Sequence, residues 1–174
     1  MADSKVRVLG VDPGTQFTGY GIVEKGTGGS LVHVCDGRIR LSPAAPLPER
    51  LCEISRRLSA LIAEFGPSVM AVESLFFAKN VKSVITLSHA RGVILLEAAN
   101  RGMGVHEYAP TSIKQAVTGY GAATKDQMQK MVMMLLGQKS VSETDAADAL
   151  AIAICHINHS TPVSAAQQGA RSAR

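Results

Sequence analysis

The 174-residue chain has no tryptophan and only seven other aromatic residues. Its three cysteines, Cys35, Cys52 and Cys155, share no short spacing. Neither a disulfide framework nor a Cys-x-x-Cys zinc site is therefore expected. No apolar run approaches the ~18 residues of a membrane span, and the first residues lack the apolar region of a signal peptide. We expect a cytoplasmic protein that keeps its thiols reduced and does not enter membranes.

Charge is also sparse. Charged residues make up 18% of the chain and apolar residues 46%, a balance that excludes a wholly disordered protein. The length suits one compact domain. The 18 basic residues exceed the 14 acidic ones, for a net charge of +4. That excess permits an anionic partner but does not demand one.

The pattern of apolar residues divides the chain into two parts. Three strand-like runs come first, which suggests an antiparallel meander, and helices then alternate with short strands. This order predicts an α/β domain with a mixed sheet. The expected strands cover residues 6–11, 20–23, 31–41, 68–72 and 104–108, and the expected helices cover 51–62, 81–99, 110–117, 124–136 and 143–158. The domain should span 1–159, and the Ser-, Ala- and Gln-rich residues 160–174 are predicted to form a disordered tail.

Four carboxylates occupy unusual positions. Asp12 follows the first strand, and Glu73 ends an apolar one. Asp145 and Asp148 share one face of the last helix. Ordinary interpretations exist for the first three: an Asx turn at Asp12, a solvated strand end at Glu73 and a capping box at Asp145. Asp148 is harder to explain, because it lies in an almost wholly apolar helix where an unpaired charge is costly.

These four acids suggest a metal site if the fold brings them together. Their mutual repulsion would raise their pKa values, and a divalent cation would relieve it. Oxygen ligands suit Mg²⁺ or Mn²⁺, and two such ions about 4 Å apart promote phosphodiester hydrolysis. Spacing alone leaves the convergence of the four acids open.

Several segments resemble the motifs of one family. Residues 9–15 and 18–21 (LGVDPGT and TGYG) resemble the opening of the RuvC-type Holliday-junction resolvases, and residues 73–80 (ESLFFAKN) look like their second motif. The segments 90–93 and 113–117 are similar to their middle segments. Residues 145–153 (DAADALAIA) look like their last motif. The resemblance runs in order from about residue 6 to residue 158.

The resemblance implies an RNase H-like fold, with a mixed five-stranded sheet flanked by helices. It implies a homodimer that binds a four-way DNA junction and makes symmetric incisions in strands of like polarity, leaving 5′-phosphate and 3′-hydroxyl ends, in recombination and DNA repair. Two Mg²⁺ ions per subunit are implied, with Mn²⁺ as a substitute. The implied protein partners are a branch-migration helicase and its junction-binding companion, of the RuvB and RuvA type.

The family also implies roles for individual residues. The implied metal ligands are Asp12, Glu73, Asp145 and Asp148. Lys114 and Lys125 match catalytic lysines near the scissile phosphate, although either could be a solvated surface residue. Phe76 matches an aromatic residue that stacks on an unpaired base. Further DNA contacts are expected from Lys79, Asn80, Lys82 and Arg91, and surplus apolar residues on helix 81–99 suggest the dimer contact.

Three other interpretations compete with this one. An actin-like or sugar-kinase ATPase also has an Asp-x-Gly loop, but it needs a much longer chain. A non-catalytic junction-binding scaffold of the same fold is disfavoured because all four acids are present. The RuvX/YqgF-like branch is disfavoured by Phe76 and the Lys79-Asn80 pair. We interpret His156 and His159 as a helix-end pair without metal.

Overall fold

The computed structural model describes residues 6–74 and 81–160, except for the side chain of Lys82. Phe76, Lys79 and Asn80 therefore lie outside the described residues, as does the predicted tail beyond Ser160. Five strands are present: β1 (Val6–Asp12), β2 (Phe17–Lys25), β3 (Leu31–Arg40), β4 (Val69–Glu73) and β5 (Gly104–Tyr108). Five α-helices join them: α1 (Leu47–Phe65), α2 (Val81–Asn100), α3 (Pro110–Thr118), α4 (Lys125–Leu136) and α5 (Thr144–Ser160). In these ranges no helix is long and apolar enough to cross a membrane.

The strands form one mixed sheet in the order β3-β2-β1-β4-β5. β1, β2 and β3 pair antiparallel, as the short turns predicted, whereas β4 and β5 add in parallel after helical crossovers. The predicted α/β class and five-stranded sheet are confirmed. Helix α1 begins earlier than expected, because Pro48 belongs to its first turn, where a missing N–H costs no hydrogen bond.

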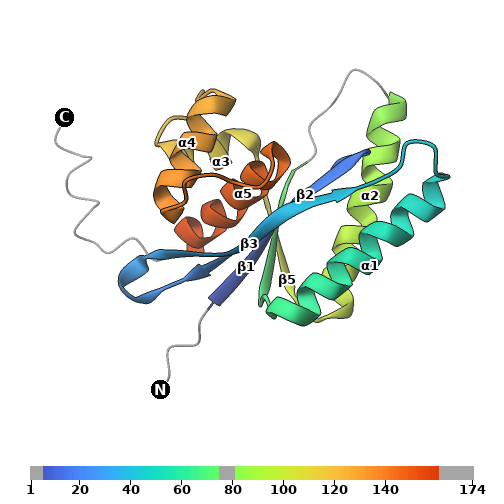
Figure 1. The fold of residues 1–174 in the computed structure, drawn as a ribbon, viewed down its shortest axis with the longest axis horizontal. Helices are drawn as coiled ribbons and strands as arrows, with labels where there is room; N and C mark the ends of the chain where they lie inside the picture. Colours follow the sequence, from blue (N-terminus) through green and yellow to red (C-terminus); the bar gives the residue numbers. More distant parts are fainter. Residues whose placement is uncertain (1–5, 75–80, 161–174) are drawn as a thin grey trace.

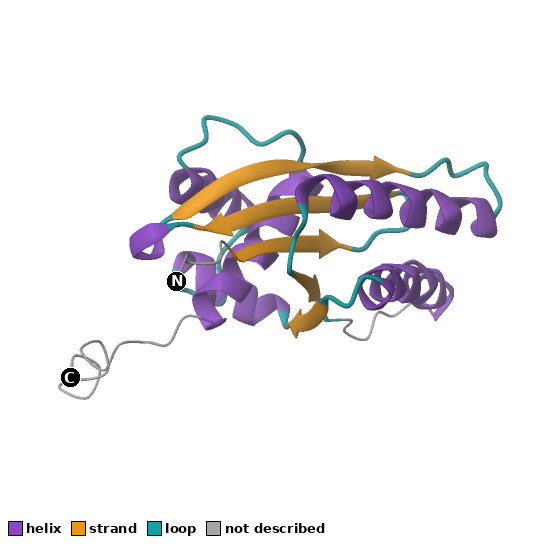
Figure 2. Ribbon diagram, turned by 90° about the horizontal axis from the view of Figure 1, so that it is seen from below, coloured by secondary structure: helices purple, strands orange, loops and turns teal. Residues whose placement is uncertain are grey.

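Helices cover both faces of the sheet (Figures 1 and 2). α1 and α2 pack on one face over a core that includes Leu9, Ile22 and Met70. α3, α4 and α5 lie on the other face over Val8, Val23 and other buried residues. Side chains alternate between the two faces along each strand, so β1 and β2 contribute to both cores.

Helix α5 lies against the backbone of β1 and β2. A Cβ atom placed on Gly10 would be 2.0 Å from the carbonyl oxygen of Ala149, and one on Gly19 would be 2.1 Å from that of Asp145. Small residues on the helix, such as Ala149 and Ala153, are fully buried at this contact. The glycines thus allow α5 to approach the sheet more closely than any strand side chain would permit.

Strand register sets the positions of two acids. Gly10 pairs with Ala71 and Val11 with Val72 across the parallel β1–β4 ladder. Asp12 and Glu73 are the next residues on these neighbouring strands. Because side chains alternate, both acids emerge on the face that carries Gly10 and Ala71, which is the face covered by α5. The sheet therefore places the two carboxylates side by side beneath that helix.

Gly10→Ala should destabilise the fold by about 3 kcal/mol or more, because the added methyl group meets helix backbone that cannot rotate away. Urea unfolding would measure the loss. Gly121→Ala is the matched control, since the nearest atom to its added Cβ lies 3.6 Å away. Equal stability of the two variants would contradict the close approach of α5.

Candidate active site

A hollow of about 240 Å³ opens where the ends of β1 and β4 meet helices α3, α4 and α5. It is large enough for several water molecules or a phosphate group. Its floor is partly apolar, with Ile113 and Ile152 among the lining residues. Five predicted catalytic residues line it: Asp12, Glu73, Lys114, Lys125 and Asp148. Residues from five elements, far apart in sequence, therefore share one site.

The carboxylates of the hollow interact unfavourably. Burial, together with the charges of Asp148, Glu73 and Asp145, raises the pKa of Asp12 to about 7. Burial and the charge of Asp148 also raise the pKa of Glu73. The protein therefore holds several acids in a place where full ionisation is costly, as expected of a site that receives a cation.

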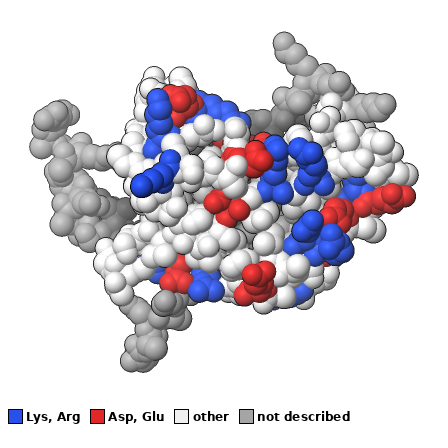
Figure 3. Space-filling model, in the orientation of Figure 1, with Lys and Arg blue, Asp and Glu red and all other residues white. Residues whose placement is uncertain are grey.

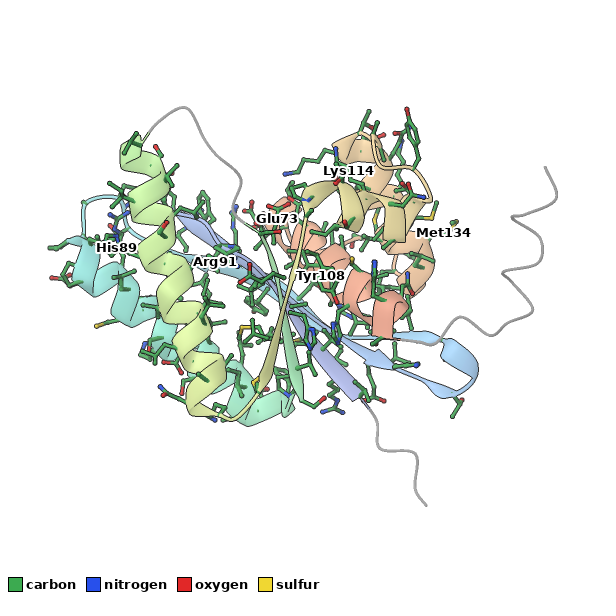
Figure 4. All side chains as sticks on the ribbon, turned by 180° about the vertical axis from the view of Figure 1, so that it is seen from behind. Glu73, His89, Arg91, Tyr108, Lys114 and Met134 are labelled. Atoms are coloured by element: carbon green, nitrogen blue, oxygen red, sulfur yellow. The ribbon has the colours of Figure 1, made fainter. Side chains whose placement is uncertain are left out.

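Two lysines offset part of this negative charge. The Nζ atom of Lys125 lies 2.8 Å from Oδ2 of Asp148, and this hydrogen bond raises the pKa of the lysine. Lys125 is the first residue of α4, directly after Thr124, whose capping box with Gln127 fixes the start of the helix. Lys114, on α3, offsets part of the rise in the pKa of Glu73. In the view of Figure 4, Glu73 lies at the end of β4, with helix α2 on one side and helix α3 on the other.

Asp145, the fourth predicted acid, is not among the residues that line the hollow. Its backbone sits over Gly19, and its carboxylate lies 3.7 Å from Nη1 of Arg38 on β3. Arg38 also pairs with Glu143 at 2.9 Å. Asp145 is close enough to raise the pKa of Asp12, so it belongs to the same electrostatic cluster although it faces a different cation.

The donor set fits a hard divalent cation, because its ligands would be carboxylate oxygens that repel one another without a counterion. Among residues 6–74 and 81–160, however, no group of three Asp, Glu, His or Cys side chains lies close enough together to hold a metal ion in the conformation described. Asp148 is instead turned to Lys125. To bind a metal ion, Asp148 would have to give up its contact with Lys125.

The predicted DNA contact at Arg91 is not supported by the position of its side chain. Arg91 is buried, with its Nη1 donating a 2.5 Å hydrogen bond to the carbonyl oxygen of Glu73. Its Nη2 atom lies 2.7 Å from Glu107 of β5. Arg91 thus joins α2 to the ends of β4 and β5, and these contacts leave its guanidinium little surface for a phosphate. The side chain of Lys82, the other predicted contact on α2, lies outside the description.

Sequence reasoning missed Arg38. The signal that could have found it is the alternation of side chains across the sheet: Asp12 pairs with Gly19, and Gly19 pairs with Arg38. All three therefore point to the face covered by α5. That Arg38 is the residue of β3 opposite Gly19 can be recognised only once the register between β2 and β3 is known.

A mixed five-stranded sheet with acids at the ends of two neighbouring strands and on a crossing helix defines an RNase H-like nuclease. Comparison with known proteins narrows this class. The family model described as "Crossover junction endodeoxyribonuclease RuvC" matches residues 8–156. The chain belongs to this family, whose members are metal-dependent nucleases.

Relatives of that description are similar over most of their length. The protein from Syntrophotalea carbinolica is 49% identical over 151 residues, which cover 87% of this chain and 93% of the relative. The protein from Geobacter sp. strain M21 is 48% identical over 164 residues, covering 94% of this chain and 99% of the relative. The predicted family is confirmed.

Solved structures agree with the sequence comparison. The structure of T. thermophilus RuvC in complex with a Holliday junction substrate matches with a TM-score of 0.84 and 32% identity, over 94% of this chain and 96% of that one. The yeast mitochondrial Holliday junction resolvase Ydc2 matches with a TM-score of 0.62 at 16% identity, over 88% and 79%. The second match supports the fold alone.

Asp12→Asn should stabilise the metal-free protein increasingly as the pH rises. Between pH 4 and 7 the folded protein retains a proton on Asp12 that the unfolded chain releases, so its stability falls through this window. The difference between variant and wild type should grow from pH 5 to pH 8 by about 2.5 kcal/mol, since the pKa of Asp12 is raised to about 7. Urea unfolding in EDTA measures it. Asp126→Asn, at an exposed position on α4, is the control, and a pH-independent difference for Asp12→Asn would contradict the raised pKa.

Proposed function

We propose that this protein is a structure-selective endonuclease that resolves four-way DNA junctions. The observation that carries this function is the family match over residues 8–156, together with the meeting of Asp12, Glu73 and Asp148 in one hollow. T. thermophilus RuvC, one of the similar solved structures, is in complex with a Holliday junction substrate. Two subunits would make paired, symmetric incisions in strands of like polarity, and thus serve recombination and repair of DNA in the cytoplasm.

Asp12, Glu73, Asp145 and Asp148 would hold two Mg²⁺ ions, for which Mn²⁺ would substitute. Ions so bound supply a water of lowered pKa and stabilise charge on the leaving 3′-oxygen. Hydrolysis would leave a 5′-phosphate and a 3′-hydroxyl. Support for this assignment comes from the raised pKa values of Asp12 and Glu73, whose causes are burial and the charges of neighbouring carboxylates. A bound cation would offset both.

Lys114 and Lys125 would neutralise charge that develops on the scissile phosphate. Both line the hollow, and Lys125 is held at a defined place by the capped start of α4. Its contact with Asp148 keeps its ammonium group close to the carboxylates, and therefore close to any phosphate that they help to bind. Phe76, Lys79, Asn80 and Lys82 remain predicted DNA contacts.

The proposed homodimer would form through α2. Val81, Ile85 and Leu96 are exposed by 71%, 52% and 56%, and at 100° per residue they lie within about 60° of one another on the helix. Ser88 and Gly92 are exposed small residues on the same stripe, which would let two helices approach closely. The proposed helicase and junction-binding partners, of the RuvB and RuvA type, would act with the bound dimer.

Asp148→Asn should abolish cutting of a synthetic four-way junction in Mg²⁺ while leaving junction binding largely intact. Loss of one ligand at such a centre should lower the rate by about a thousandfold or more. Gel assays with junction and plain duplex, each in Mg²⁺ and in chelator, measure this. Asp126→Asn removes the same charge from an exposed residue of α4 that pairs with Lys130, and it should cut normally. Equal cutting of junction and duplex by the wild type would indicate a general nuclease instead.

Leu96→Glu should convert the proposed dimer to a monomer, because two buried carboxylates would face each other across the α2 contact. Analytical ultracentrifugation gives the mass, and the junction assay should show single nicks in place of paired incisions. Met134→Glu is the control, since Met134 is 67% exposed on α4. A wild type that sediments as a monomer would overturn the dimer.

A further inference from the structure

The end of β3 carries two arginines on the same face as the acids. Arg38 pairs with Gly19, and Arg40 pairs with Phe17, two residues along the same strand. Since Gly19 pairs with Asp12, alternation puts Arg38 and Arg40 on the side of the sheet to which Asp12 points. Figure 3 shows Lys and Arg atoms gathered beside Asp and Glu atoms where β3 and α1 lie in Figure 1.

Both guanidinium groups lie against one aromatic ring. The Cζ atom of Arg38 is 4.4 Å from the centroid of the Phe17 ring, and that of Arg40 is 5.7 Å from it. These distances fall within the range of cation–π attraction. Phe17 therefore restricts the movement of two side chains that are otherwise long and flexible.

The two arginines differ in their partners. Arg38 is engaged by Glu143 and Asp145. Arg40 is exposed, and within the part of the chain that the structure describes no carboxylate lies within ion-pair distance of it. Its positive charge is therefore available to a ligand from outside the chain.

A shallow hollow adjoins Arg40. It is lined by Gln16, Phe17, Arg40, Leu41, Ser42 and Pro43. The Leu41 N–H donates to the carbonyl oxygen of Gln16 at 2.8 Å, which joins two segments that line the hollow. Residues that carry a cation, an amide and a hydroxyl group thus line one hollow together with an aromatic ring, a combination suited to a phosphate and its sugar.

We propose that Arg40, supported by Phe17, binds a backbone phosphate of the DNA strand that passes through the active site. Ladder spacing puts the Cα atom of Arg40 about 12 Å from that of Asp12, two strands across and two residues along. At about 3.4 Å per nucleotide this is a span of a few nucleotides. The contact holds the strand beside the scissile phosphate without reading its sequence. This inference rests on the proposed function.

Binding titrations test the site. Fluorescence anisotropy with a four-way junction in EDTA, where no cutting occurs, should give Arg40→Ala a dissociation constant about tenfold above that of the wild type. The slope of log affinity against log salt should decrease by about one. Arg40→Lys should recover most of the affinity, and Phe17→Ala should lose part of it because Arg40 then lacks its support.

Lys25→Ala is the matched control. It removes one positive charge from the end of β2 that lies farthest from Phe17 and Arg40, where Lys25 pairs with Val6 of β1. Affinities and salt slopes that are equal for Arg40→Ala and Lys25→Ala would overturn the phosphate site. Loss of the wild type's own preference for junction over duplex would instead overturn the proposed function, so the two failures are distinguishable.

Single neutral linkages in the DNA locate the contact. Junctions carrying one methylphosphonate at each position up to four nucleotides on either side of the scissile phosphate should bind the wild type less tightly at one position in particular. Arg40→Ala should be insensitive to that same replacement, because the charge pair is already gone. If Arg40→Ala remained as sensitive as the wild type at every position, no phosphate would pair with Arg40 and the proposal would fail.

Discussion

The contact between helix α5 and the backbone of the sheet is the constraint on which the site depends. Glycines at positions 10 and 19 remove the side chains that would hold the helix away. The helix that carries Asp145 and Asp148 is thereby brought over the strands that carry Asp12 and, one strand further, Glu73. With an ordinary side chain at either glycine, the helix would have to shift outward and the acids would separate. The active site is thus a consequence of backbone packing first and of side-chain chemistry second.

The charge of this protein is organised around that packing. The four acids, once set aside, leave 18 basic residues against ten acidic ones. Some of the basic residues serve the acids directly: Lys125 pairs with Asp148, and Arg38 with Asp145. The balance between burial, repulsion by the other carboxylates and the charge of Lys125 leaves Asp12 with a pKa of about 7. A modest net charge therefore combines an anionic centre with a basic surrounding, an arrangement suited to a polyanion that must approach clustered carboxylates.

Much of the fold could be predicted from the sequence, because turn residues and apolar periodicity are local signals. They gave the antiparallel strands, the later alternation of helices and strands, and the acids at strand ends. Arg91 shows where this reasoning stops. Its place in a family-like motif suggested a phosphate contact, but its tertiary contacts are to the Glu73 carbonyl and to Glu107. Likewise, the pairing of Arg38 with Asp145 depends on register and helix placement, neither of which is visible in the neighbouring residues of the chain.

The position of Asp12 and Glu73 side by side on neighbouring strands has a consequence for misfolded states. If β4 paired with β1 one residue out of register, every side chain of one strand would turn to the other face of the sheet. One carboxylate would then point into the apolar layer beneath α1 and α2. A lone ion there costs several kcal/mol. The acids therefore penalise the wrong strand pairing much more than hydrophobic residues of similar size would. Residues kept for hydrolysis thus also widen the energy gap between the native sheet and its nearest competitors.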